Sequence, residues 1–270
     1  PGIAKTLIAR MLSQCLDLHF SRIQFTPDLM PTDVTGTSVF NLKTSEFTFH
    51  PGPVFANIVL IDEINRAPAK TQAALFEVME ERQVTIDGKT IPLERPFVVL
   101  ATQNPFEQEG TYKLPEAQLD RFLFRIKIGY PSLEDEIQIL NRFKGDFEQN
   151  SLRSLVPVAN AGILANAKNL IERIHIQDEL IRYIATIIDH TRNSGDLMLG
   201  GSPRASLAIL KSAKAMAALA GRDFVTPEDI QKVLVPVLNH RIILHPEKEL
   251  EGIEPEEVIF DIVQRVEIPR

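Results

Sequence analysis

The chain has 270 residues, of which 44% are hydrophobic, and its formal net charge at pH 7 is −7. This length predicts two domains, each with its own core. The acidic balance argues against a general affinity for nucleic acid or for an anionic membrane surface. No apolar run approaches the roughly 18 residues of a membrane-spanning helix, so no membrane partner is predicted. The single cysteine, Cys15, cannot form an internal disulfide, which favours a reduced, cytoplasmic setting.

The first residues, PGIAKT, are similar to the second half of a phosphate-binding loop, G-x-x-x-x-G-K-[ST], with Ala4 where the second glycine usually stands. Such a loop needs backbone N–H groups that face a phosphate chain, a lysine for the β and γ oxygens and a hydroxyl on Mg²⁺. Lys5 and Thr6 meet the last two needs. Apolar residues at helical spacing predict a helix over residues 5–16. Because phosphate-binding loops normally follow a buried strand, we expect the biological polypeptide to be longer at its N-terminus and to supply that strand.

The stretch NIVLIDEINR, residues 57–66, runs from four apolar residues into Asp62 and Glu63. It predicts a buried parallel strand that ends in two carboxylates, at the edge where open α/β sheets bind ligands. On an extended backbone the two side chains point in opposite directions, so that Asp62 can hold a metal-bound water while Glu63 orients an attacking water. Taken alone, the stretch is equally a core strand that ends in two solvated acids. Its pairing with the phosphate-loop sequence favours a nucleotide site.

Alternating and periodic patterns predict the elements around this strand. They comprise a strand over 19–26, a hairpin of 37–40 with 46–49, a helix from about 67 to 81, a hairpin over 82–91 with a type I′ turn, a strand over 96–102, a short helix over 114–122 and a last strand over 124–129. Asn104 follows the strand over 96–102 and is placed to reach a γ-phosphate or its attacking water. An asparagine that caps the turn before Pro105 is the alternative.

Beyond residue 130 every periodic segment is helical, which predicts a domain boundary there. Helices are expected over 132–143, 159–173, 177–191, 203–220, 227–239 and 255–266. In the sequence GGSPR, Ser202 is expected to cap a helix that begins at Pro203. Arg204 then stands in the first turn, where the helix dipole disfavours a cation, and this suggests an anionic partner. An arginine turned toward solvent or toward Asp196 is the alternative.

Taken together, GIAKT, IVLIDEINRAP, ATQNP, LPEAQLDRF and GGSPRASL resemble the motifs of the MoxR family of AAA+ ATPases, in the family's order and over almost the whole chain. The resemblance implies an α/β fold with a P-loop AAA+ core. That core, residues 1–130, would be an αβα parallel sheet without its first strand, and residues 131–270 would form an all-α lid domain. It also implies a ring, expected to be a hexamer, with ATP and Mg²⁺ bound between subunits.

The family's functional residues carry over to matching positions of this sequence. The resemblance implies that Thr6 and Asp62 hold Mg²⁺, that Glu63 activates water, and that nucleotide contacts Gly2, Ile3, Ala4, Lys5, Thr6, Leu7 and Asp62. Further matches are Asn104 to sensor 1, Arg204 to the sensor 2 arginine and Arg121 to the arginine finger, with Arg66 as a second candidate for a contact in a neighbour's site. The two hairpins, at 39–49 and 82–91, resemble insertions of this clade that could touch a partner protein.

The function that the resemblance implies is an ATP-driven, chaperone-like machine that remodels or matures other proteins. The family is often associated with partners that bear von Willebrand factor A domains and with metal-cofactor insertion. A nucleotide-binding switch or scaffold with little turnover is the alternative, motivated by Ala4. A motor on DNA or RNA is a third hypothesis, and the acidic balance and the lack of an aromatic-basic stripe count against it. The six histidines show no metal-ligand spacing.

Overall fold

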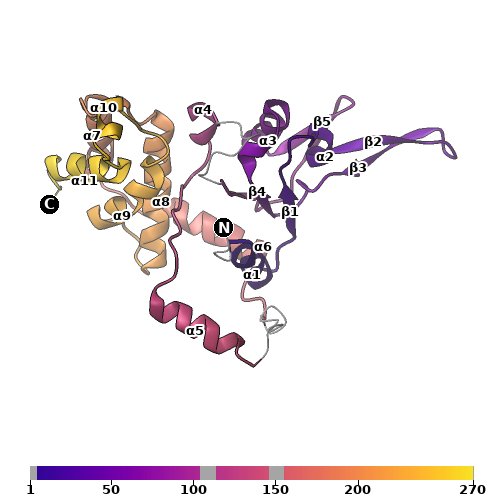
Figure 1. Ribbon diagram of the computed structural model, residues 1–270, viewed down its shortest axis with the longest axis horizontal. Coiled ribbons are helices and arrows are strands. Elements are labelled where there is room, and N and C mark those ends of the chain that lie inside the picture. The colour runs from indigo at the N-terminus through magenta and orange to yellow at the C-terminus, as the bar shows by residue number, and fades with distance from the viewer. Residues whose placement is uncertain (1–4, 104–113, 146–154, 270) are drawn as a thin grey trace. The chain divides into compact units, whose positions relative to one another are not determined.

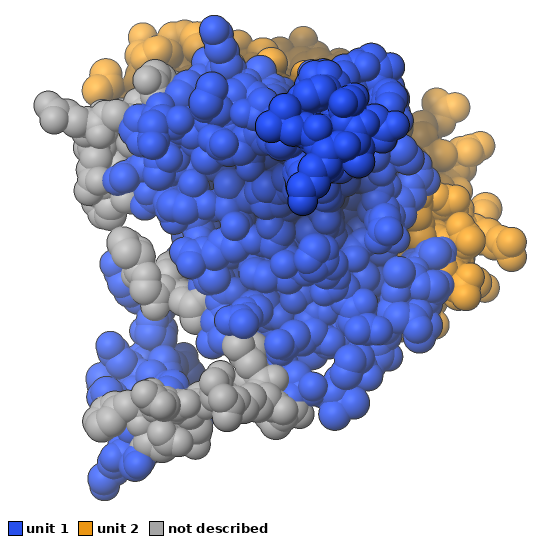
Figure 2. Space-filling view, turned by 90° about the vertical axis from the view of Figure 1, so that its right-hand side faces the viewer, with its two compact units in different colours: residues 1–113, 128–165 blue, residues 114–127, 166–270 orange. Residues whose placement is uncertain are grey.

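The computed structural model describes residues 5–103, 114–145 and 155–269 (Figure 1). By its internal contacts the chain divides into two compact units (Figure 2). Unit 1 comprises residues 1–113 and 128–165, and unit 2 comprises residues 114–127 and 166–270. The domain boundary expected at residue 130 stays a prediction.

A parallel sheet of three strands organises unit 1, in the order β1 (Phe20–Gln24), β4 (Ile58–Asp62) and β7 (Val98–Ala101). All five residues of the central strand β4 are buried, which confirms the buried parallel strand that its apolar run predicts. Gln24 pairs in register with Asp62, and Ile61 pairs with Ala101. The carboxyl ends of the three strands therefore meet at one edge of the sheet.

Asn57 aligns the opposite ends of the same strands. Its side chain is buried, and the residue is 8% exposed. Oδ1 accepts a hydrogen bond from the backbone N–H of His19 at 3.1 Å, and Nδ2 donates to the carbonyl oxygen of Pro96 at 3.0 Å. One amide side chain thus bridges the residues that precede β1 and β7, so all three strands begin at a common level.

Helices α1 (Lys5–Cys15) and α3 (Ala69–Glu81) lie on opposite sides of these strands (Figure 1). Helix α1 contacts β4, and it buries Ala9 and Ser13. Between β4 and α3 the chain forms the short 3₁₀ helix η1 (Ile64–Arg66). Gln72 of α3 is buried and donates to the carbonyl oxygens of Ile64 and Ala67, so it fixes the turn that follows the two acids.

Two hairpins extend unit 1, as predicted. The first pairs β2 (Gly36–Asn41) with β3 (Glu46–Pro51) and projects away from the sheet (Figure 1). The second pairs β5 (Gln83–Ile86) with β6 (Lys89–Pro92). Its turn residues Asp87 and Gly88 have φ of 51° and 74°, the positive values that a type I′ turn requires. The short helix α2 (Pro31–Thr35), which sequence periodicity missed, precedes the first hairpin and contacts α3.

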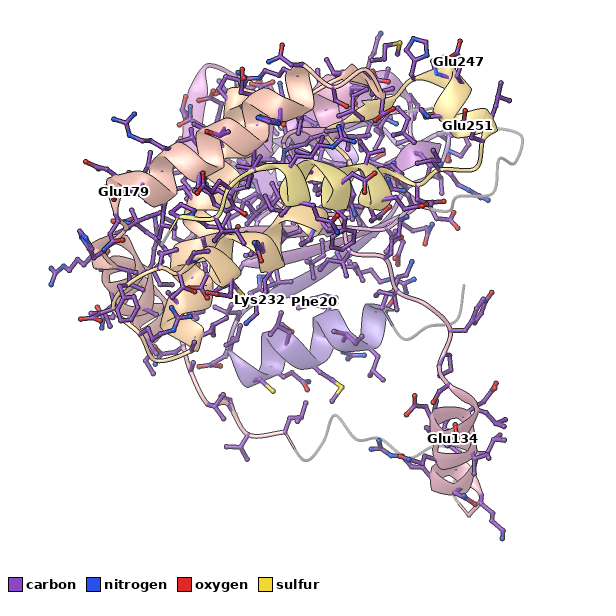
Figure 3. All side chains as sticks on the ribbon, turned by 90° about the vertical axis from the view of Figure 1, so that its left-hand side faces the viewer. Phe20, Glu134, Glu179, Lys232, Glu247 and Glu251 are labelled. Atoms are coloured by element: carbon purple, nitrogen blue, oxygen red, sulfur yellow. The ribbon has the colours of Figure 1, made fainter. Side chains whose placement is uncertain are left out.

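Most of unit 2 is helical, and the long helices match the periodic segments of the sequence. Its elements are α4 (Glu116–Leu119), α7 (Asp178–Arg192), α8 (Pro203–Leu219), α9 (Pro227–Leu238), α10 (Pro246–Leu250) and α11 (Pro255–Arg265), with the short pair β8 (Leu197–Leu199) and β9 (Ile243–Leu244). Buried aliphatic residues of the long helices form one core, while Glu179, Glu247 and Glu251 lie at the surface (Figure 3). Helix α5 (Leu133–Phe143) belongs to unit 1, and α6 (Ala161–Arg173) runs from unit 1 into unit 2.

The strand predicted over 124–129 is wrong. These residues form no strand, and up to residue 127 they belong to unit 2. The backbone N–H of Arg125 donates to the carbonyl oxygen of Pro236 at 2.8 Å, and Lys127 forms ion pairs with Glu254 at 2.8 Å and with Glu256 at 2.9 Å. The segment is apolar enough for a strand, but its backbone and charges find partners on helices. Among the described residues, no helix combines the length and the apolar character that a bilayer crossing needs.

Candidate functional site

The carboxyl edge of the sheet gathers polar side chains from β1, from β4 and from the residue that follows β7. Asp62 ends β4, and its side chain is 13% exposed. Its Oδ2 lies 2.6 Å from Nε of Arg22 on β1, and its Oδ1 accepts a hydrogen bond from the hydroxyl of Thr102 at 3.3 Å. Asp62 is therefore held in one orientation from both neighbouring strands.

Glu63 does not continue the strand, and the expectation that both acids leave an extended backbone is wrong. Glu63 has φ 57° and ψ 53°, the left-handed conformation, which costs a non-glycine residue roughly 1–2 kcal/mol. Its N–H donates to the hydroxyl of Thr102 at 3.0 Å. Its Oε2 lies 2.8 Å from Nε of Arg66 and 3.4 Å from Nε2 of Gln24. Thr102 therefore contacts both acids and stabilises the strained turn between them.

Three of these contact residues were not predicted from the sequence: Arg22, Gln24 and Thr102. Arg22 and Gln24 are two residues apart on β1, so their side chains lie on the same face of the strand. That spacing is visible in the sequence, but it carries meaning only once β1 is known to lie beside β4. Thr102 directly follows β7 and is placed by the same parallel pairing.

Lys5 and Thr6 form the first turn of α1, and both are partly exposed. Leu7 follows them and is 40% exposed. Because α1 contacts β4, the structure brings the helix that these residues begin against the strand that ends in Asp62. Gly2, Ile3, Ala4 and Asn104, which the resemblance also assigns to the site, lie outside the described residues.

The donor chemistry of Thr6 and Asp62 fits Mg²⁺. The Thr6 hydroxyl and the Asp62 carboxylate are hard oxygen ligands, the kind that Mg²⁺ takes in small number while it keeps several waters. Asp62 is rigidly held and nearly buried. A full protein cage would need more ligands, and the described residues contain no cluster of three or more His, Cys, Asp or Glu side chains suited to one. Mg²⁺ sites with one or two protein oxygens are completed by water and phosphate oxygens, and Thr6 and Asp62 are of the kind that such sites use.

Arg121 and Arg204 lie in unit 2, and both are exposed. Arg204 stands in the first turn of α8, as predicted. Ser202 occupies the N-cap position, but the expectation that its side chain caps the helix is wrong. Its hydroxyl instead donates to both carboxylate oxygens of Asp120, at 3.2 and 3.0 Å. The residue next to Arg121 therefore contacts the residue that starts the helix of Arg204.

The loop before α8 is tightly held by α7. The N–H of Gly201 donates to the hydroxyl of Thr191 at 2.9 Å, and Nε of Arg192 donates to the carbonyl oxygen of Gly201 at 2.8 Å. A Cβ at Gly200 would lie 2.6 Å from backbone atoms of Arg192, so only glycine allows this approach. The GGSPR sequence thus fixes where α8 begins, and it therefore fixes Arg204 in the first turn of that helix.

The two hairpins of unit 1 border a cleft of about 380 Å³. Its lining is mainly apolar and aromatic, from Ser38, Phe47, Phe49, Ile86, Asp87, Lys89 and Ile91. At the outer end of the first hairpin Leu42 is 86% exposed and Phe47 is 70% exposed. The rings of Phe40 and Phe47 pack against each other with centroids 5.1 Å apart. Adjacent exposed apolar groups of this kind make the hairpin a candidate contact surface.

Comparison with known proteins agrees with this geometry. Residues 1–124 match the family described as "ATPase family associated with various cellular activities (AAA)", and residues 189–262 match the AAA lid domain. The chain is 46% identical to the uncharacterized protein YeaC of Bacillus subtilis strain 168, over all of this chain and 83% of that protein. It is 43% identical to Chaperone MoxR1 of Mycobacterium tuberculosis, over all of this chain and 73% of that protein.

A solved structure has the same fold as this chain. The crystal structure of a putative ATPase from Cytophaga hutchinsonii matches all of this chain and 84% of that chain, with a TM-score of 0.92 and 43% sequence identity. The fold is α/β, with an AAA domain followed by an AAA lid domain. Together, the acid-tipped central strand, the two domains and these similarities over the whole of this chain show that the chain belongs to the MoxR family of AAA+ ATPases.

Proposed function

We propose that this chain binds ATP with Mg²⁺ at the carboxyl edge of β1, β4 and β7 and hydrolyses it. The observation that carries the proposal is the turn at Asp62 and Glu63, where two carboxylates are held in separate orientations. This turn ends β4, the strand that α1 contacts. Strain at Glu63 is maintained by Thr102, and such strain is typical of functional sites.

Each residue would make a separate contribution. Lys5 and Thr6 would bind the phosphate chain at the start of α1, together with backbone N–H groups of residues 2–7. Asp62 and Thr6 would hold Mg²⁺, which offsets negative charge on the phosphate oxygens when bound. Glu63 would orient a water molecule and accept its proton as the water attacks. Asn104, the proposed sensor 1, would contact the γ-phosphate or that water.

Arginines would complete the charge balance around the γ-phosphate. We assign Arg204 to the nucleotide bound by its own subunit and Arg121 to that of a neighbour, with Arg66 as a second candidate for the contact in trans. An arginine that a neighbour supplies is worth roughly 10³ to 10⁵ in rate. The chain would therefore act as a ring, which we propose to be a hexamer, and its specific activity should rise with protein concentration as the ring assembles.

The proposed use of this hydrolysis is chaperone-like remodelling, maturation or metal-cofactor insertion of partner proteins in the cytoplasm. The word "chaperone" in the name of the 43% identical relative supports this assignment. Partners with von Willebrand factor A domains are the proposed clients, and the exposed apolar end of the β2–β3 hairpin is the proposed contact surface. The competing proposal is a nucleotide-binding switch with little turnover.

Hydrolysis by the wild-type chain and by Glu63→Gln tests this function. We expect turnover in the wild type, and a loss of at least about 100-fold in Glu63→Gln with ATP binding retained. The matched control is Glu77→Gln, which changes an exposed glutamate on α3 and should keep wild-type turnover. Equal rates in the wild type and Glu63→Gln would refute the enzymatic function, and tight binding without turnover would favour the switch.

A further inference from the structure

One buried arginine in unit 2 binds the segment that carries Arg121. The side chain of Arg241 is 2% exposed. Its Nε lies 2.8 Å from Oδ1 of Asp120, and its Nη2 donates to the carbonyl oxygen of Asp120 at 3.1 Å. It also donates to the carbonyl oxygens of Phe122 and, at 3.1 Å, of Leu123. Arg241 thus contacts the residues on both sides of Arg121.

The neighbouring residue His240 adds a further contact to the same segment. Its Nε2 lies 3.0 Å from the carbonyl oxygen of Phe122, and its ring is buried. Residues 120–123 are therefore fixed by their backbone at the end of α9, while Arg121 itself is exposed. A rigid backbone below an exposed arginine restricts the positions that the guanidinium can reach.

The carboxylate of Asp120 also connects this segment to α8. It accepts the hydroxyl of Ser202, at 3.2 and 3.0 Å, while Arg241 binds its Oδ1. Ser202 is the N-cap of α8, and Arg204 lies two residues further on in the first turn. One carboxylate therefore ties the residue beside Arg121 to the helix start that carries Arg204.

Stability alone does not explain this arrangement. A buried ion pair often contributes no more than apolar residues of similar size, because burial costs both charges their hydration. Besides the carbonyl oxygen of Val237 on α9, Arg241 binds the carbonyl oxygens of Asp120, Phe122 and Leu123, which lie on both sides of Arg121. Such a cluster holds the backbone around Arg121 in one conformation.

We propose that Asp120 is a positioning residue that holds Arg121 and Arg204 as one unit. This inference rests on the proposed function, in which Arg204 contacts the subunit's own nucleotide and Arg121 contacts a neighbour's. With both arginines tied through Asp120, a subunit that engages its own ATP through Arg204 also places Arg121 for the next site. The connection couples neighbouring sites within one helical unit.

Ser202→Ala tests the connection with the smallest change, because it removes the hydroxyl and leaves Asp120 and Arg241 in place. The matched control is Ser212→Ala, which removes a buried hydroxyl from the same helix, one that has no hydrogen-bond partner in the described part of the chain. We expect Ser202→Ala to lower kcat by about 10- to 100-fold, as a small misplacement of a catalytic group does. The dissociation constant for ATP should change by less than about fivefold, and Ser212→Ala should leave kcat within about twofold.

A double-mutant cycle separates positioning from simple loss of structure. Under single-turnover conditions with radiolabelled ATP, where slow rates are measurable, Ser202→Ala is compared in the wild-type and Arg121→Ala backgrounds. Positioning through Arg121 predicts that the loss caused by Ser202→Ala becomes smaller once Arg121 is removed, and any loss that remains acts through Arg204. An equal loss in both backgrounds, or no loss in the wild-type background, would overturn the inference.

The same assays distinguish this inference from the proposed function. Wild-type turnover that Glu63→Gln abolishes, together with an unchanged Ser202→Ala rate, would refute only the positioning role of Asp120. Absence of wild-type turnover would refute both. Thermal unfolding of each variant shows whether a lower rate comes from a smaller folded fraction, and Asp120→Asn, which keeps the side-chain shape, should reproduce the loss of Ser202→Ala in the folded protein.

Discussion

The guanidinium of Arg22 lies 2.6 Å from the carboxylate of Asp62, so the proposed metal-binding acid already has a cationic partner. Mg²⁺ would have to displace this partner or share the carboxylate with it. The Arg22 side chain is 52% exposed, and an ion pair of that kind is worth about 1 kcal/mol or less. The pair should therefore compete with Mg²⁺ weakly but measurably.

Arg22→Gln is expected to lower the Mg²⁺ concentration for half-maximal ATP hydrolysis by up to about fivefold, because the competing charge is gone. A titration of Mg²⁺ at a fixed ATP concentration measures this half-maximal concentration. Arg182→Gln, an exposed arginine of α7, is the control and should leave the titration unchanged. An unchanged or higher Mg²⁺ requirement in Arg22→Gln would show that Arg22 does not compete for Asp62.

Thr102 is expected to control both the stability and the rate, since its hydroxyl contacts Glu63 and Asp62. Thr102→Val keeps the shape but leaves the Glu63 N–H without this acceptor, which should cost about 1–3 kcal/mol of unfolding free energy and lower kcat. Thr102→Ser retains the hydroxyl and should recover most of both. Urea unfolding and steady-state kinetics measure the two effects, and equal behaviour of the two variants would contradict the role of the hydroxyl.

Burial and the charge of Arg241 lower the pKa of His240 to about 4. Arg125 also lowers this pKa, while the Phe122 carbonyl and Asp120 raise it. The unfolded chain, with a histidine pKa near 6.5, therefore binds more protons than the folded chain between pH 6.5 and about 4. The contribution of neutral His240 to the free energy of unfolding is fully present above pH 6.5. It is lost as the pH falls through this window, by up to roughly 3 kcal/mol.

His240→Gln cannot be protonated, so its unfolding free energy should fall less between pH 7 and pH 5 than that of the wild type. Urea unfolding at several pH values measures this difference, and His175→Gln, at an exposed histidine, controls for the loss of any imidazole. Parallel pH profiles for the wild type and His240→Gln would rule out this contribution.

The exposed end of the β2–β3 hairpin is expected to serve client contact and not folding. Leu42 is 86% exposed, so Leu42→Ser should change the unfolding free energy by less than about 0.5 kcal/mol. It should leave the basal ATPase rate unchanged and weaken binding of a purified von Willebrand factor A domain partner to the Glu63→Gln ring. Leu250→Ser, at a leucine that is 89% exposed in unit 2, should affect neither property. Equal client binding by both variants would remove the hairpin from the proposed contact.

Local patterns predicted the elements whose stability is local or whose burial is complete. The four apolar residues before Asp62 specify a central strand because only such a strand is buried on both faces. Asp87 and Gly88 specify a type I′ turn by the backbone that they tolerate. Ser132, whose hydroxyl accepts the N–H of Asp135 at 3.2 Å, marks the start of α5 through a contact three residues away.

The failures came from partners that are distant in the sequence. Residues 124–129 have the composition of a strand, but Arg125 and Lys127 bind groups more than 100 positions away. Ser202 has the position of a cap, yet its hydroxyl goes to Asp120. The left-handed turn at Glu63 depends on Thr102, which a strand pattern cannot reveal. The candidate site was thus predictable as a set of motifs, while the side chains that orient it required the fold.

The amide of Asn57 lies at the opposite end of β4 from the two acids, about 16 Å away along a five-residue strand. Because its hydrogen bonds align the beginnings of the three strands, Asn57 also determines how far each strand extends at the other end. A substitution at Asn57 would therefore act at long range: a change of register where the strands start would carry Gln24 and Thr102 out of step with Glu63, with no atom of the reaction centre altered.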